Sequence, residues 1–213
     1  MSIRHDEKKR RSAGEVVVPL LIGTLGVVGV VLAAIFGSGF KFIDVGCLIL
    51  IVASTAVGYT QRTFRGFLTV PFLYVATVVA ATFYVQTAPY IGAPFGDFRE
   101  VAPPRGVKAL SFMVLMLVVW IALEAITRSF LKNTSLPRLG VLDNLGGMLL
   151  YAIVGILVAA IIFNAFGYSQ YWGGEAGRAK LRPMFRGVMR IHYATQAFWF
   201  PKGQPFFYTD GLD

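Results

Sequence analysis

Four charged residues lie inside or beside long apolar stretches, where an ionisable side chain could bind an ion, carry a proton or pair with another charge. They are Asp44, Glu124, Arg128 and Asp143. Such groups are costly in hydrocarbon and often mark a function. Here Glu124 and Arg128 are four residues apart and can neutralise each other on one helix face. Asp44 and Asp143 each stand where an apolar stretch begins, so caps and water can satisfy them. We therefore favour structural pairing and anchoring over an ion path.

The sequence contains no motif typical of a catalytic site. It has no Walker loop, no H-E-x-x-H and no G-x-S-x-G. The two histidines, His5 and His192, lie near opposite ends of the chain, and the single Cys47 excludes an internal disulfide. His192 could ligate a pigment or a metal ion, but its isolation favours an ordinary interfacial side chain. We expect a protein that is not an enzyme and that holds no cofactor or metal.

Composition places the chain in the membrane. Hydrophobic residues make up 56% of its 213 residues, and they come in long blocks rather than in the short periods of a soluble domain. The formal net charge is +9, with most basic residues at the ends of these blocks and in the tails. Anionic lipid headgroups are therefore the expected partner, and nucleic acid is not.

Five apolar stretches are long enough to cross about 30 Å of hydrocarbon as helices. They cover residues 16–36, 43–60, 67–88, 110–131 and 139–166. This predicts an all-α membrane protein with about five transmembrane helices: a basic tail (1–15), a first span (16–36), a four-span core (42–167) and a C-terminal tail (168–213). The first stretch is too long for a signal peptide and is expected to be retained. We expect short links at 37–42 and 61–66, and a surface loop at 89–106.

Small residues on two of the spans predict close contact between helices, because a thin surface lets two backbones approach. The last span, in which we expect Asp143 to be the N-cap, carries Gly147, Gly155 and Ala159. In the first span the small residues recur every four positions, at Gly29, Ala33 and Gly37. The alternative for the first span is the general abundance of glycine in membrane helices, and the sequence leaves that choice open.

The distribution of basic residues predicts the orientation of the spans. If the N-terminus is cytoplasmic, the link with Arg62 and Arg65 and the loop with Lys132 and Arg138 are cytoplasmic too. Five spans then place the C-terminal tail on the other side, although this tail holds six basic residues.

The tail has the pattern of an amphipathic helix lying in the membrane surface. Arginines recur every four residues, and apolar side chains fall on the opposite face. The basic face consists of Arg178, Arg182, Arg186 and Arg190, and the apolar face of Leu181, Met184, Val188 and Ile191. We expect Arg182, Arg186 and Arg190 to contact headgroups, together with Trp199 from the aromatic run that follows. The alternative is that this helix docks on a partner protein.

Three short motifs in a fixed order resemble the colicin V production protein (CvpA) family over residues 42–167. The first core span opens with Ile43-Asp44, the next begins at Arg65-Gly66-Phe67, and the last carries Gly140, Asp143 and Gly147 in a Gly-x-x-Asp-x-x-x-Gly segment. Compared with the four-span family pattern, this chain has an added first span and a longer, more basic tail.

The resemblance implies a protein of the bacterial inner membrane that supports toxin or peptide export, or envelope homeostasis. The added span and the tail favour a second hypothesis, an accessory subunit of a larger respiratory or photosynthetic complex. A third hypothesis is a channel or ion carrier that uses Asp44 and Glu124. Besides the lipid bilayer, we expect membrane-protein partners or further copies of the chain.

Overall fold

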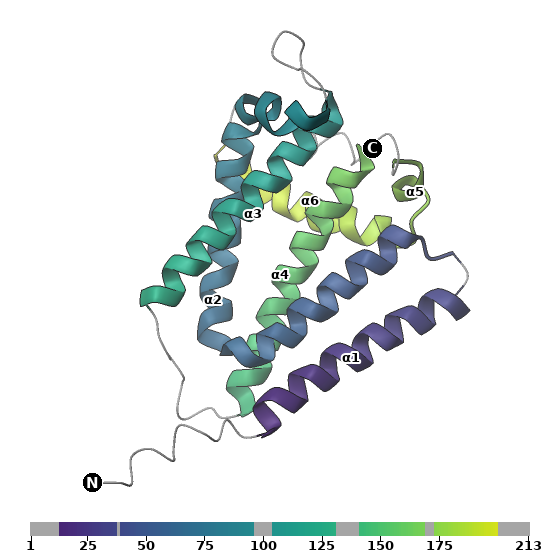
Figure 1. Cartoon of the computed structure of the whole chain (residues 1–213), viewed down its shortest axis with the longest axis vertical. Coiled ribbons are helices and arrows are strands. Elements are labelled where there is room, and N and C mark those ends of the chain that lie inside the picture. The colour runs from purple at the N-terminus through teal and green to yellow at the C-terminus, as the bar shows by residue number, and fades with distance from the viewer. Residues whose placement is uncertain (1–12, 38, 96–103, 131–140, 169–172, 200–213) are drawn as a thin grey trace.

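The computed structural model describes residues 13–37, 39–95, 104–130, 141–168 and 173–199, and every regular element within them is helical. Figure 1 shows their arrangement. The elements are α1 (Ala13–Phe36), α2 (Phe42–Gly92), the 3-10 turn η2 (Ala93–Phe95), α3 (Arg105–Phe130), α4 (Val141–Gly167), α5 (Gly173–Gly177) and α6 (Arg182–Gln196).

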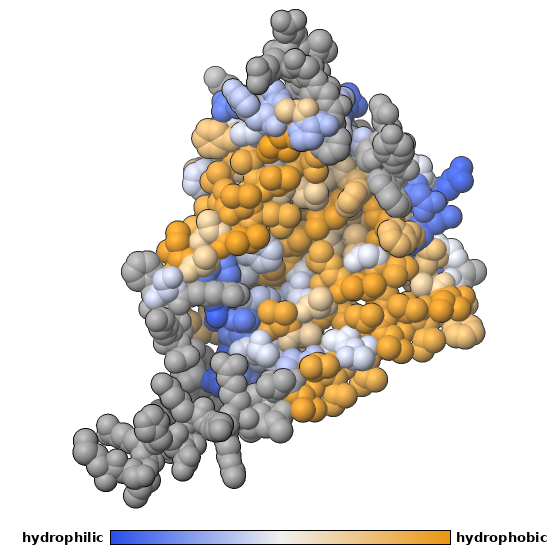
Figure 2. Space-filling model, in the orientation of Figure 1, coloured by the Kyte–Doolittle hydropathy of each residue, from blue (hydrophilic) through white to orange (hydrophobic). Residues whose placement is uncertain are grey.

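Four of these helices are long and apolar enough to cross a membrane: α1, α2, α3 and α4. The 51 residues of α2 correspond to about 77 Å of helix, more than twice the thickness of the hydrocarbon layer. It therefore contains two of the five predicted spans. In Figure 2 a broad hydrophobic surface extends over α1, α3 and α4, and hydrophilic residues gather toward the ends of the molecule. The chain is an all-α, multi-pass membrane protein.

The helix α2 is divided by a sharp corner at Arg62, whose φ of 66° and ψ of 169° are not helical. In Figure 1 its two parts form a V. We call residues 42–61 the first arm and residues 63–92 the second arm. The predicted link at 61–66 is thus a single residue, because the polar residues on either side of Arg62 continue the two helices. This backbone conformation is rare outside glycine. It costs about 1–3 kcal/mol and persists only where contacts with the surrounding structure hold it.

The predicted loop at 89–106 is also shorter than expected. The second arm continues through Pro89 to Gly92, and α3 begins at Arg105. Residues 96–103 lie outside the described part of the chain.

The helix α4 packs between the two arms of the V, and small residues on both partners allow it. Gly147, Gly155 and Ala159 lie on the face of α4 that contacts the first arm, where they meet Gly58, Ser54 and Cys47 respectively. The helix α3 runs along the second arm, and α6 crosses behind α4 (Figure 1). The buried core where these helices meet includes Leu73, Ala76, Ala80, Phe112, Met116, Val158, Phe163 and Phe185.

The helix α1 packs on the first arm of α2 through glycines other than the predicted ones. A Cβ atom added at Gly26 would collide with Val52, and one added at Gly23 would lie 3.6 Å from Ala56 Cβ. By contrast, a Cβ atom at Gly29 would meet nothing within 4 Å, and Ala33 is exposed. Gly37 follows the helix, where an added Cβ would meet the carbonyl of Ala33. Contact of Gly29 and Ala33 with another chain stays a prediction.

Four features lie at one end of the bundle: the corner at Arg62, the start of α1, the end of α3 and the start of α4 (Figure 1). The start of α2, with α5 and α6, lies at the other end of the first arm. This arrangement agrees with the expectation that the N-terminus and the two basic links lie on the same side of the membrane. The loop at 131–140 itself lies outside the described residues.

Candidate functional site

The corner of α2 is held by Asp143 from the first turn of α4. Its Oδ1 accepts a hydrogen bond from the backbone N–H of Thr63 (3.0 Å), and its backbone carbonyl accepts one from the Thr63 hydroxyl (2.7 Å). A residue that follows a break in a helix has an N–H without a helical partner, and burial makes an unpaired N–H costly. Asp143, 2% exposed, satisfies this group. The predicted N-cap role is therefore wrong: α4 begins two residues earlier, and the carboxylate serves another helix.

At the same corner the backbones of α2 and α4 touch through glycines. A Cβ atom added at Gly58 would lie 2.5 Å from the carbonyl oxygen of Gly147. One added at Gly147 would lie 2.7 and 2.8 Å from the Arg62 backbone C and Cα, and would collide with the Gly58 carbonyl. One turn further along, a Cβ at Gly66 would lie 2.8 Å from Leu150 Cβ. Side chains at these positions would push the two helices apart.

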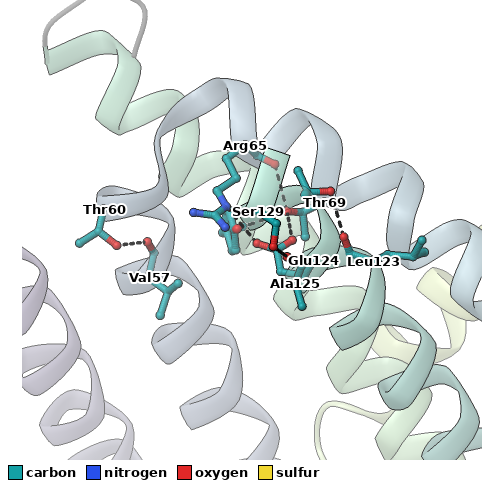
Figure 3. A network of polar contacts seen from close by, with 10 residues as sticks. Val57, Thr60, Arg65, Thr69, Leu123, Glu124, Ala125 and Ser129 are labelled. Carbon is teal, nitrogen blue, oxygen red and sulfur yellow. Dashed lines mark hydrogen bonds and ion pairs between the residues drawn. The ribbon is translucent and has the colours of Figure 1, made fainter. Parts of the chain in front are cut away.

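Beside the corner, Arg65 and Glu124 form an ion pair between α2 and α3. Arg65 Nε donates to Glu124 Oε1 at 3.0 Å, and the two side chains are 26% and 14% exposed. The Thr69 hydroxyl lies 3.2 Å from Glu124 Oε2 and 3.2 Å from the Tyr151 hydroxyl on α4. Figure 3 shows Arg65, Thr69 and Glu124 pointing toward one another from the two helices. Three helices are therefore joined by one polar network.

The predicted pairing of Glu124 with Arg128 is not tested by the described side chains, and it stays a prediction. The salt bridge that the structure describes joins Glu124 to Arg65, 59 positions away in the sequence. The side chain of Arg128 is not among those described. A signal for the partner on α2 was present in the Arg65-Gly66-Phe67 motif: the glycine permits the close approach of α4, and the arginine precedes it by one residue.

At the opposite end of the first arm, Asp44 joins the start of α2 to the segment before α6. Its Oδ2 accepts from the backbone N–H of Lys41 (3.0 Å) and of Lys180 (2.9 Å), and its Oδ1 accepts from that of Leu181 (3.1 Å). The side chain is fully buried. The sequence places Asp44 at the start of a span, where a helix cap and water would satisfy its carboxylate. The cap is present, but the C-terminal segment covers the carboxylate.

The far end of α6 is fastened to the second arm of α2 by a cluster of polar and aromatic side chains. Gln196 Nε2 donates to Thr77 Oγ1 (2.7 Å), and the Tyr74 hydroxyl donates to the Thr195 carbonyl (2.7 Å). The indole N–H of Trp199 donates to the Tyr74 hydroxyl (3.0 Å). The His192 ring meets Tyr74 edge to face, with centroids 6.3 Å apart. Burial lowers the pKa of His192 from 6.5 to about 4, so the ring is neutral at physiological pH.

The buried face of α6 differs from the predicted apolar face. It consists of Phe185, Met189, His192 and Gln196, whereas Met184 and Ile191 are 41% and 70% exposed. Polar His192 and Gln196 do not register in a hydrophobic pattern, although hydrogen bonds and ring contacts make their burial favourable. The helix therefore has three faces rather than two: a packed face, a basic flank and an exposed apolar flank.

At Asp44, at Asp143 and in the Arg65–Glu124 network, each buried carboxylate is matched by backbone N–H groups or by an opposite charge. Within the described residues, no three His, Cys, Asp or Glu side chains gather as metal ligands would. The arrangement fixes where helices begin, turn and cross. These charged side chains are therefore positioned to hold the helices of the bundle together.

The Arg65–Glu124 pair should contribute measurably to stability. We expect Arg65→Gln and Glu124→Gln each to lower the free energy of unfolding by about 1–3 kcal/mol, because each removes one charge of a largely buried ion pair between α2 and α3. The double variant should lose less than the sum, with a coupling energy of about 1 kcal/mol, since the pair is partly exposed. Unfolding by titration with sodium dodecyl sulfate in mixed micelles measures all three values. Additive effects would show that the pair does not form.

Comparison with known proteins supports the motif order found in the sequence. A family model described as colicin V production protein matches residues 43–190, which include Asp44, the corner of α2, the Arg65–Glu124 network and most of α6. No curated protein and no solved structure matched the chain.

Proposed function

Since the chain belongs to the colicin V production protein family, we propose that it is a non-enzymatic protein of the bacterial inner membrane, with a cytoplasmic N-terminus. Its role in this proposal is to support the export of a toxin or peptide, or the integrity of the cell envelope. Family membership is the observation that carries the proposal, because the match covers the packed core together with most of α6.

The character of the buried polar groups supports a role without catalysis. Asp44 and Asp143 bind backbone N–H groups at a helix start and at the corner of α2, and Glu124 binds Arg65 and Thr69. These three carboxylates therefore bind donors of the protein itself, as groups that tie helices together do. A membrane scaffold needs such ties.

The experiment is a clean deletion strain complemented from a plasmid. We expect deletion to raise permeability to a bulky antibiotic or to lower secretion of a reporter peptide, and the wild-type chain to restore both. The double variant Arg65→Gln/Glu124→Gln, checked for folding, should restore them too, because the proposal gives this pair no chemical step. Normal permeability and secretion in the deletion strain would overturn the proposal. A folded double variant that fails to complement would favour a channel or carrier.

A second candidate, an accessory subunit of a larger membrane complex, is favoured by the surface of α1. Its Gly23 and Gly26 meet α2, while Gly29 and Ala33 face away from the described part of the chain. A small-residue surface of this kind suits a further helix. Extraction from native membranes in mild detergent tests it: stoichiometric co-purifying proteins would support the subunit, and a particle of this chain alone would reject it.

A further inference from the structure

The bundle divides into two groups of helices that meet at the corner of α2. Small residues along α4 contact the first arm at Cys47, Ser54 and Gly58, and α1 packs on the same arm. The helix α3 runs along the second arm instead (Figure 1). We call α1, the first arm and α4 the first lobe, and the second arm with α3 the second lobe. The corner at Arg62 lies where the two lobes meet.

Close to the corner, polar contacts tie the lobes together. Thr63 binds Asp143, and the hydroxyl groups of Thr69 and Tyr151 lie 3.2 Å apart. Farther from the corner, apolar side chains of the core fill the space between the lobes. In lipid, apolar helix faces gain little from packing on one another, because acyl chains offer similar contacts. Polar contacts that lie far from the corner therefore have the greatest effect on whether the lobes stay closed.

The helix α6 makes such contacts, because it starts on the first lobe and ends on the second. Just before its first turn, the backbone N–H groups of Lys180 and Leu181 bind Asp44. One turn into the helix, Phe185 packs on Phe163 of α4 with ring centroids 5.0 Å apart. The first part of α6 is therefore fixed to the first lobe, and its far end crosses to the second arm.

The arginines of α6 also have partners within the protein. Arg182 Nη1 donates to the Gly177 carbonyl at 3.1 Å, and Arg186 and Arg190 have interactions of their own. Their predicted contact with lipid headgroups, like that of Trp199, stays a prediction. The described contacts of α6 are thus with other parts of the same chain.

The two arms of α2 and the helix α6 close a triangle. The 18 residues from Asp44 to Arg62 span about 27 Å of the first arm, and the 15 residues from Arg62 to Thr77 span about 22 Å of the second. The 15 residues from Leu181 to Gln196 also span about 22 Å. Because all three sides are stiff helices, their lengths fix the angle between the arms as long as both ends of α6 stay attached.

The two attachments of α6 differ in strength. At Asp44 a carboxylate binds backbone N–H groups, and hydrogen bonds to a charged group are stronger than neutral ones. On the second arm the groups are neutral: Gln196 Nε2 donates to Thr77 Oγ1, and the Tyr74 hydroxyl donates to the Thr195 carbonyl. Gln196 is fully buried, yet its Oε1 has no hydrogen-bond partner among the described residues, which is costly. We call these contacts on Tyr74 and Thr77 the latch.

We propose that the two lobes are hinged at the corner of α2 and that the latch holds them closed. Hinges are short segments that absorb changes in φ and ψ. The corner is a single residue, Arg62, in a backbone conformation that its surroundings must hold. Release of the latch lets the second lobe rotate away from α4 while α6 stays bound to Asp44. Rotation uncovers Thr77 and Gln196, both fully buried in the closed form, so the open cleft has hydrogen-bonding groups on both sides.

The distance between the two arms measures this opening. Spin labels at Gly46 and Gln86, in a Cys47→Ala background, report the distance by pulsed electron paramagnetic resonance on the full chain in lipid nanodiscs. Both labelled positions are exposed, and nothing lies within 4 Å of a Cβ atom added at Gly46. Gln86 lies about 36 Å of helix beyond the corner, so an opening of about 10° moves it by about 6 Å.

The variant Tyr74→Phe/Thr77→Val removes two hydroxyl groups and nearly keeps the shapes of the side chains, so the latch loses its partners on the second arm. One hydrogen bond changes such an equilibrium by about fivefold, so the loss of two should raise the ratio of open to closed molecules about 25-fold. We expect a second, longer distance between the arms, together with faster hydrogen exchange of residues 192–199. Tyr74→Phe alone is the milder variant, and it should produce a smaller open fraction.

Two controls separate a hinge from a general loss of structure. Thr82→Val/Tyr90→Phe removes the same groups from exposed positions of the same arm, and its distances should match those of the wild type. Spin labels at Gln86 and Ile121 lie on the second lobe together, so the distance between them should stay the same in every variant.

Three results would overturn the proposal. Unchanged exchange of residues 192–199 in the variants would show that the hydroxyl groups do not hold α6. Faster exchange with an unchanged distance between the arms would show that the lobes stay closed without the latch. A longer distance in the control variant, or between Gln86 and Ile121, would show a loosening of the whole bundle in place of a hinge.

Discussion

Replacing Gly147 with valine is expected to prevent the V of α2 from closing around α4. The new Cβ would collide with the Gly58 carbonyl and lie 2.7 Å from the backbone carbon of Arg62. These are backbone atoms, which cannot rotate away as a side chain does. Overpacking commonly costs about 1–3 kcal/mol even where side chains can yield, so we expect a loss above about 3 kcal/mol, or no folded protein.

The measurement is the midpoint of unfolding in sodium dodecyl sulfate, with the yield of monodisperse protein in detergent. Gly46→Ala is the matched control, because it also adds a Cβ to a helical glycine but nothing lies within 4 Å of that position. It should be neutral, or stabilising by about 0.5–1 kcal/mol, since alanine favours the helix. A Gly147→Val variant as stable as this control would show that α2 and α4 do not meet as described.

Replacing Asp44 with alanine is expected to release α6 from the bundle while α2 and α4 stay packed. The substitution leaves the N–H groups of Lys41, Lys180 and Leu181 without their shared acceptor at a fully buried position. Hydrogen bonds to a charged group contribute about 1.5–3 kcal/mol each, and an unsatisfied buried donor is costly. We expect the docking of α6 to weaken by about 3–5 kcal/mol, because the contacts at its far end remain.

Hydrogen exchange measures the docking of α6 separately from the packing of the other helices. In the Asp44→Ala variant, residues 180–196 should exchange faster by at least a hundredfold, while residues 143–160 keep their protection. Asp44→Asn, which retains one acceptor oxygen, should fall between. Lys180→Ala is the control, since it keeps the backbone N–H that binds Asp44 and removes only the ammonium that lies 4.7 Å from the centre of the Phe40 ring. Unchanged protection of α6 in the Asp44→Ala variant would contradict the assignment.

The sequence predicted the membrane helices because their signal is local. A run of about 20 apolar residues is sufficient to indicate a span, and the ends of α1 and α4 lie within a few residues of the predicted ones. The corner of α2 had no such signal. Arg62 adopts a conformation that a non-glycine residue rarely takes, and the residues next to it in the sequence do not indicate a break in the helix. The surrounding contacts impose it, and these come from Asp143, 80 residues away from Thr63.

The polar partnerships were predicted less well for the same reason. Asp44, Glu124 and Asp143 could be identified as unusual from their positions beside apolar stretches, but each was assigned a partner close in sequence. In the structure Glu124 also binds Arg65 on another helix, and Asp44, besides its cap at Lys41, binds Lys180 and Leu181, more than 130 positions away. Helix periodicity shows which side chains lie close together on one helix, but it contains no information on their contacts with other helices. Partners of this kind follow only from tertiary packing.

The single-residue corner of α2 also constrains how the protein enters the membrane. The two arms are joined at Arg62 without an intervening loop, so the folded form leaves no free chain between them. We expect residues 42–92 to insert together as a hairpin, with Arg62 and Arg65 at its tip. Positive charge at a hairpin tip resists translocation, so we expect the tip to stay on the side of the membrane where the chain is synthesised. One bend thereby sets the direction of two spans in a single step of biogenesis.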